Sequence, residues 1–142
     1  MIVRHLDQLI GLFNKRGMDL PDGLFDRRTQ FRLNGEPYES LLGRAPNDPL
    51  VLMLTRGPAG YRFIVKSLQH AVPDAKLERS QVDPDGSRID VRLSGHLRGS
   101  NEPIYLEIPI QIAMTSRGEI EYADAAIDAA PLEQLRVARA TT

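Results

Sequence analysis

The chain has 142 residues, and its 18 basic and 19 acidic side chains are interspersed and leave a formal net charge of −1. The sequence has no stripe of basic residues that could follow the phosphate backbone of a nucleic acid, so we expect no nucleic-acid partner. The absence of cysteine excludes disulfides and thiolate chemistry, and no apolar run reaches the roughly 20 residues that span a bilayer, so we expect no membrane partner.

Helix patterns dominate the first half of the chain. In Val3–Lys15 apolar side chains recur three and four residues apart, which predicts an amphipathic helix ended by Gly17. Asp19–Asp22 combines an acidic cap with a proline and predicts the start of a short second helix. Asp48-Pro49 is another such start, before an apolar run. A longer amphipathic helix is expected at Ala59–Ala71.

Between and after these helices the sequence predicts short strands and turns. Thr29–Leu33 alternates like a strand, and Asn34-Gly35 is typical of a tight turn. Glu36–Asn47 has a loop-like composition. Lys76–Val82 is expected to form an edge strand, followed by a turn at Asp83–Gly86.

Three long strands are expected to follow, and they organise the chain. Their ranges are Arg88–Leu97, Ile104–Met114 and Glu119–Ile127, with a turn at Thr115–Gly118 between the last two. Strand side chains alternate between faces, so the apolar residues at every second position of the middle strand line one face. These are Ile104, Leu106, Ile108, Ile110, Ile112 and Met114. The tail from 129 to 142 is expected to hold one or two helical turns, at Pro131–Ala138.

This order of elements predicts a single α+β domain spanning residues 1–142. A curved, mixed or antiparallel sheet would be covered on its apolar face by the early helices. Such an arrangement leaves a cone that is open at one end, where a pocket can form.

Several short motifs resemble the SnoaL-like polyketide cyclase branch of the nuclear transport factor 2-like superfamily, which has a cystatin-like fold. The matching segments are Phe13–Asp19, Val72–Ala75, Gly95–Gly99, Gly118–Ile120, Asp128 and Leu132–Leu135. The resemblance implies a cone-shaped α+β barrel with an apolar pocket between sheet and helices. It also implies a homodimer formed through the outer face of the sheet.

The chain departs from the functional residues of that superfamily. The histidine usual in the branch falls on Leu97 when Gly95 and Gly99 are aligned. Ketosteroid isomerases share the fold, and their hydroxyl, base and acid fall on Ile10, Leu33 and Ile110, which are all apolar. An isomerase of that kind is therefore not expected.

Two aspartates near the end of the last strand are the candidate catalytic residues. Ile120, Tyr122 and Asp124 share one face of that strand, and we expect this face to point inward. A carboxylate in an apolar cavity has a raised pKa that suits a general acid or base. The alternative for Asp124 is a solvated position at the rim. Asp128 matches the acid/base aspartate of the branch, and its alternative is a cap for the following helical turn.

The remaining candidates would contact a substrate. Tyr122 and Tyr61 could orient a ligand with their hydroxyls, or could be aromatic core residues. Leu97 and Ile110 are expected in the pocket wall. His96 lies on the polar face of its strand and is interpreted as a surface or interface residue.

These features lead to three hypotheses about function. The first is a cofactor-independent cyclase or isomerase that acts on an apolar, carbonyl-containing, polyketide-like molecule by proton transfer. The second is a non-catalytic module that binds a hydrophobic small molecule. The third is a dimeric assembly protein. No cofactor and no metal are expected, and the first residues show no signal-peptide pattern, which favours a cytoplasmic location.

Overall fold

The computed structural model describes residues 2–17, 20, 24–37, 55–83 and 87–140, which form three helices and one six-stranded sheet. In chain order the elements are α1 (Ile2–Lys15), β1 (Phe25–Leu33), β2 (Glu36–Pro37), α3 (Gly57–Ala71), β3 (Lys76–Val82), β4 (Arg88–His96), β5 (Pro103–Met114), β6 (Ile120–Ala125) and α4 (Ala129–Ala140). The predicted α+β class is confirmed.

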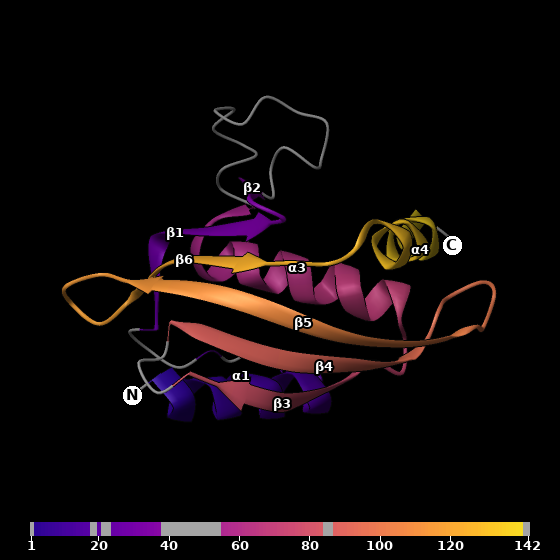
Figure 1. The fold of residues 1–142 in the computed structure, drawn as a ribbon, viewed down its shortest axis with the longest axis horizontal. Coiled ribbons are helices and arrows are strands. Elements are labelled where there is room, and N and C mark those ends of the chain that lie inside the picture. Colours follow the sequence, from indigo (N-terminus) through magenta and orange to yellow (C-terminus); the bar gives the residue numbers. More distant parts are fainter. Residues whose placement is uncertain (1, 18–19, 21–23, 38–54, 84–86, 141–142) are drawn as a thin grey trace.

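The sheet is mixed and does not close into a barrel. Its strand order is β2-β1-β6-β5-β4-β3, and β1 runs parallel to β6 while all other pairs are antiparallel. Figure 1 shows the long β4 and β5 strands at the centre, with β3 at one edge and β1 toward the other. The strands that come last in the chain therefore form the middle of the sheet.

The helices cover one side of this sheet. In Figure 1, α3 lies behind β5 and β6, and α1 lies along the β3 edge. Helix α3 packs against β1 and against α4, and α1 packs against β3. Apolar side chains from both layers form one core, in which Phe13, Leu24, Val72 and Leu93 are almost fully buried.

The end of α1 is fastened to the β3 edge by polar contacts. The Asn14 side chain accepts a hydrogen bond from the backbone N–H of Leu77 (2.8 Å) and donates one to its carbonyl (2.9 Å). Arg16 donates to the carbonyl oxygens of Ala75 and Pro73, both at 2.9 Å. Because these groups pair with backbone that an edge strand would expose, the helix end protects that edge.

The predicted Asn34-Gly35 turn is confirmed. Leu33 pairs with Glu36, and both turn residues have positive φ (53° for Asn34 and 82° for Gly35). A two-residue hairpin turn requires this backbone shape, which asparagine and glycine tolerate best. The Asn34 side chain also exchanges two hydrogen bonds with the backbone of Ile127, at 2.8 and 2.9 Å. The hairpin is thus attached to the segment between β6 and α4.

Most predicted elements agree with the structure within one or two residues. β1 is the main exception among the strands, because it begins at Phe25 rather than Thr29. Its first half has exposed charged side chains that hide the strand pattern. The predicted short helix after Asp19, the loop to Asn47, the helix start at Asp48-Pro49 and the turn to Gly86 lie wholly or mostly outside the described residues.

Two predictions near the C-terminus are corrected. The last strand, β6, ends at Ala125 rather than Ile127. The helical turns predicted at Pro131–Ala138 are a full helix of 12 residues, α4. No described helix is long and apolar enough to cross a membrane.

Candidate functional site

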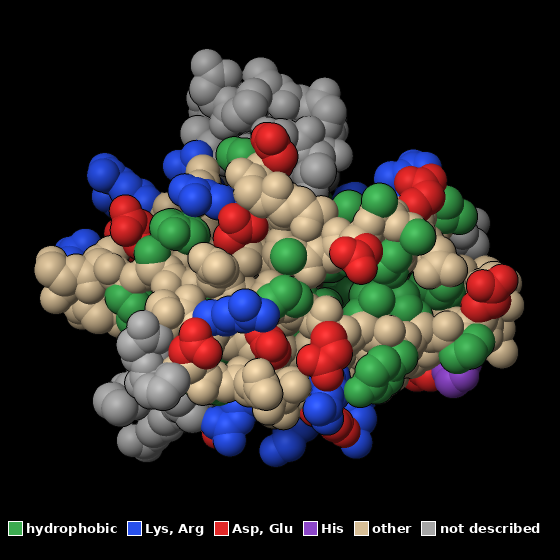
Figure 2. Space-filling model, viewed as in Figure 1, with side chains coloured by type: hydrophobic (Ala, Val, Ile, Leu, Met, Phe, Trp, Pro, Cys, Tyr) green, Lys and Arg blue, Asp and Glu red, His purple; other side chains and the backbone are tan. Residues whose placement is uncertain are grey.

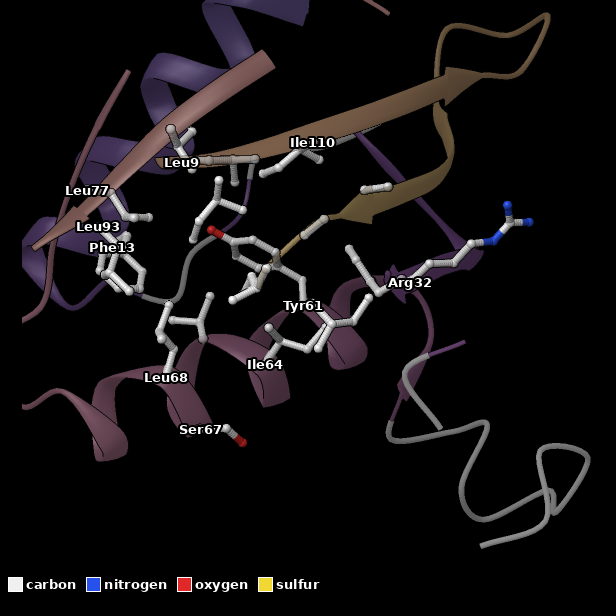
Figure 3. A pocket seen from close by; sticks show the side chains of 18 of the residues that line it. Leu9, Phe13, Arg32, Tyr61, Ile64, Ser67, Leu68, Leu77, Leu93 and Ile110 are labelled. Carbon is white, nitrogen blue, oxygen red and sulfur yellow. The ribbon is translucent and has the colours of Figure 1, made fainter. Parts of the chain in front are cut away.

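A cavity of about 430 Å³ lies between the sheet and the helices. Its wall contains apolar residues from every described helix and from every strand except β2. α1 contributes Leu6, Leu9, Ile10 and Phe13, and β5 contributes Ile108, Ile110 and Ile112. Figure 3 shows several of these side chains converging from both layers.

The β6 wall of the cavity is formed by Ile120, Ala123 and Ala125, and Ile127 continues it. Ile120 and Ala123 are three positions apart, which a regular strand would place on opposite faces. The pairing with β5 explains this, because Met114 pairs with Ile120 while the adjacent Ala113 pairs with Tyr122. One extra residue on β6 makes a β-bulge, and such a bulge reverses which later side chains point inward.

The inward orientation predicted for Asp124 and Tyr122 is therefore wrong. Neither side chain lines the cavity. The Tyr122 ring lies under the Arg32 guanidinium, 4.0 Å from ring centroid to Cζ. The Asp124 carboxylate accepts a hydrogen bond from the backbone N–H of Gly35 at 3.1 Å. Both residues therefore contact the β1–β2 hairpin instead of the cavity.

Asp128 is exposed and directly precedes α4. Its carbonyl oxygen accepts a hydrogen bond from the backbone N–H of Leu132 at 3.0 Å, and this bond closes the first turn of the helix. This is the geometry of a helix N-cap residue. Asp128 lies outside the cavity wall, although the preceding Ile127 lies in it.

The structure places the other three predicted contact residues differently from one another. Tyr61 and Ile110 are in the cavity wall, whereas Leu97 is not. Leu97 is buried in the core instead, at the turn after β4. Ile10 and Leu33, the apolar residues at isomerase positions, also line the cavity.

Tyr61 is the most informative polar residue of the wall. It comes from the second turn of α3, and its ring stacks on Phe25 at 5.2 Å between centroids. Figure 3 shows its hydroxyl directed away from α3 into the cavity. No described residue hydrogen-bonds to this hydroxyl. Burial raises the pKa of Tyr61 to about 12, so the phenol is neutral at physiological pH.

The other polar side chains of the wall are Arg32, Ser67, Arg136 and Arg139. Figure 3 shows the Arg32 guanidinium and the Ser67 hydroxyl pointing away from the cavity. No aspartate, glutamate or histidine is among the wall residues in the described part of the chain. Among the described residues there is also no cluster of three acidic or histidine side chains that could hold a metal ion.

Outside the cavity, His96 forms a pair with Asp74. The His96 Nδ1 atom lies 2.7 Å from Asp74 Oδ2, and the His96 backbone N–H donates to Asp74 Oδ1, also at 2.7 Å. Hydrogen bonds from the side chain and then the backbone of His96 lower the pKa of Asp74. The pair joins the turn after α3 to the end of β4, and the interpretation of His96 as a surface residue agrees with its exposure.

Sequence reasoning missed the contribution of α4 to the cavity. Leu132, Leu135, Arg136 and Arg139 all line it. Their spacing of three, four and seven residues is the signal of one helix face, and it is readable in the sequence. The one or two turns expected for the tail are too short to present such a face.

Comparisons with known proteins identify the fold. No family model matches the chain, and no curated protein matches it. Solved structures do match. One is TerC co-crystallised with polyporic acid, at 12% identity and a TM-score of 0.65, covering 94% of this chain and 96% of that one. Another is a SnoaL-like polyketide cyclase from Agrobacterium tumefaciens, at 15% identity and a TM-score of 0.61, with 94% and 96% covered.

A third similar structure has a ketosteroid isomerase-like fold, comes from Catenulispora acidiphila and was solved in complex with trimethylamine. It is 10% identical to this chain with a TM-score of 0.64, and 99% of this chain and 93% of that one are covered. At these identities the similarity concerns the fold and not the activity. The chain therefore has the nuclear transport factor 2-like fold that SnoaL-like polyketide cyclases and ketosteroid isomerase-like proteins share.

Proposed function

We propose that this chain binds an apolar small molecule in the cavity and that Tyr61 donates a hydrogen bond to a carbonyl or hydroxyl oxygen of that ligand. The supporting observation is a neutral phenol that points into an apolar space and has no hydrogen-bond partner among the described residues. The Tyr61 side chain is half-buried, and a hydroxyl withdrawn from water without a partner costs up to about 1–3 kcal/mol, which a ligand acceptor would offset.

The cavity has the size and composition of a ligand site. Its volume of about 430 Å³ falls within the roughly 300–1,000 Å³ usual for small-molecule pockets, which are mostly apolar with a few polar groups that fix orientation. Two structures of the same fold were solved with small molecules, TerC with polyporic acid and the Catenulispora protein with trimethylamine. These observations favour binding as the primary function.

Proton transfer next to a ligand carbonyl is the second candidate, and the neutral phenol favours it. A hydrogen bond from Tyr61 would stabilise negative charge on the carbonyl oxygen as the enolate forms. Asp128 lies outside the cavity wall and no described wall residue is an aspartate, glutamate or histidine, so the proton would pass to water or to a group of the substrate. Cyclisation or isomerisation of a polyketide-like molecule is chemistry of this kind.

The binding proposal is tested with prodan, an aryl ketone whose fluorescence shifts to the red when its carbonyl accepts a hydrogen bond. Wild-type protein should bind prodan, and Tyr61→Phe should bind it roughly 2–10-fold more weakly with bluer emission, as loss of one hydrogen bond predicts. Tyr122→Phe removes the same hydroxyl from the outer side of the sheet and is the matched control. No binding of prodan to any of the three proteins would overturn the proposal.

A further inference from the structure

Helix α4 presents two kinds of side chain to the cavity. Leu132 comes from its first half and Leu135 from its middle, and Arg136 and Arg139 follow in its second half. The four residues lie on one helix face because they are separated by three, one and three positions. The face that covers the cavity is therefore apolar at its beginning and cationic at its end.

The charged side chains that the described residues contribute to the cavity wall are all positive. They are three arginines, with no lysine, aspartate, glutamate or histidine among the described wall residues. The Arg32 guanidinium is directed away from the cavity (Figure 3). Its Nε donates a hydrogen bond to the Gln30 side chain, and the group covers the Tyr122 ring on the outer side. The positive charge available to a ligand is thus that of Arg136 and Arg139.

Arg136 and Arg139 differ in the contacts that their guanidinium groups make within the protein. Arg136 donates from Nε and from a terminal nitrogen to the two carboxylate oxygens of Glu133, the first at 2.8 Å. Arg139 lies over the Phe63 ring of α3, 5.8 Å from Cζ to the centroid, and has no carboxylate partner among the described residues. Both side chains are exposed, so an anion can reach them without a large desolvation cost.

We propose that the ligand of the cavity is an amphipathic anion, with an apolar body between the sheet and α3 and a carboxylate or similar acidic group at Arg136 and Arg139. The inference rests on the proposed binding function and adds the charge of the ligand to it. Its alternative is that the arginines only cover apolar surface with their aliphatic stems, in which case the charge of a ligand makes no difference.

Two naphthalene probes separate these readings. N-phenyl-1-naphthylamine is neutral, and 1-anilinonaphthalene-8-sulfonate is the same skeleton with one sulfonate. Wild-type protein should bind the sulfonate more tightly than its neutral twin. The double variant R136Q/R139Q should lose roughly fivefold in affinity for the sulfonate, the size of two exposed ion pairs, and stay within about twofold for the neutral probe. Added salt should weaken only the sulfonate complex.

The matched control is Arg117→Gln, which removes one positive charge from the β5–β6 turn, outside the cavity wall. Glu133→Gln should strengthen sulfonate binding, because it releases Arg136 from its carboxylate partner. Equal affinity of wild type for both probes, or an equal loss of both in R136Q/R139Q, would overturn the inference and leave the binding function standing. If neither probe nor prodan binds, the binding function itself fails.

Discussion

The carboxylate of Asp124 accepts a hydrogen bond from the backbone N–H of Gly35, at 3.1 Å, and so joins the end of β6 to the β1–β2 turn. Gly35 has a φ of 82° and belongs to the same turn as Asn34, which pairs with Ile127. Two consecutive turn residues are therefore held by the segment that leads into α4. The hairpin and the C-terminal cavity wall form one connected unit.

This relationship predicts a structural effect of changing Asp124. Asp124→Ala should lower the free energy of unfolding by about 1 kcal/mol, the usual net value of one hydrogen bond, as measured by urea denaturation. Prodan affinity should stay within about twofold of wild type, because Asp124 does not line the cavity. Normal stability combined with lost binding would mean that this carboxylate acts in the cavity after all.

The Asp74–His96 pair predicts a dependence of stability on acid. Hydrogen bonds from His96 lower the pKa of Asp74 in the folded protein. A carboxyl group with a lowered folded-state pKa stabilises the protein above its unfolded pKa of about 3.9, and this contribution is lost as the pH falls through the folded value. The stability difference between wild type and Asp74→Asn should be present at about pH 5 and should disappear toward about pH 2. A difference that persists unchanged in acid would contradict the prediction.

Tyr61 should make stability depend on pH at the alkaline end of the range. Burial raises its pKa to about 12, whereas a tyrosine in the unfolded chain ionises near 10. Its contribution to stability is therefore complete below pH about 10 and is lost as the pH rises toward the folded value. An absorbance titration should show a phenol ionisation above pH about 10, and Tyr61→Phe should remove that late phase. A single titration near pH 10 in wild type would contradict the burial of Tyr61.

Homodimer formation through the outer sheet face stays a prediction, and Tyr105 provides its test. This side chain is 64% exposed on β5, close to the Arg92–Glu107 ion pair between β4 and β5. Figure 2 shows hydrophobic side chains gathered near the start of β5 on this face. Tyr105→Glu should convert a dimer to a monomer in light scattering. Val137→Glu changes an exposed hydrophobic residue of α4 and should have no effect.

The sequence predicted the fold because local patterns agreed with the tertiary packing. The alternation along β5 and the stripe on α1 gave the two apolar faces that enclose the cavity, and Asn34-Gly35 gave a turn that only a few residues allow. The similarity to solved structures confirms that architecture. The sequence predicts Tyr61 and Ile110 in the wall because each lies on an apolar face of its element.

The direction of Asp124 could not be predicted because one bulge decides it. Alternation counted from Ile120 puts Tyr122 and Asp124 inward, and the extra residue before Tyr122 reverses that assignment. Pairing with β5 and β1 sets the bulge, and neither register is readable from β6 alone. The prediction that Leu97 lines the cavity is wrong for a related reason. Leu97 lies in the turn beyond the last residue of β4, where the alternation of the strand no longer applies.

The decisive measurement of the hydrogen bond from Tyr61 is the affinity and emission of prodan bound to Tyr61→Phe, compared with Tyr122→Phe. Prodan should bind Tyr61→Phe roughly 2–10-fold more weakly and emit there at shorter wavelength, while Tyr122→Phe should match wild type. Equal affinity and equal emission for both variants would show that the phenol of Tyr61 does not hold the ligand.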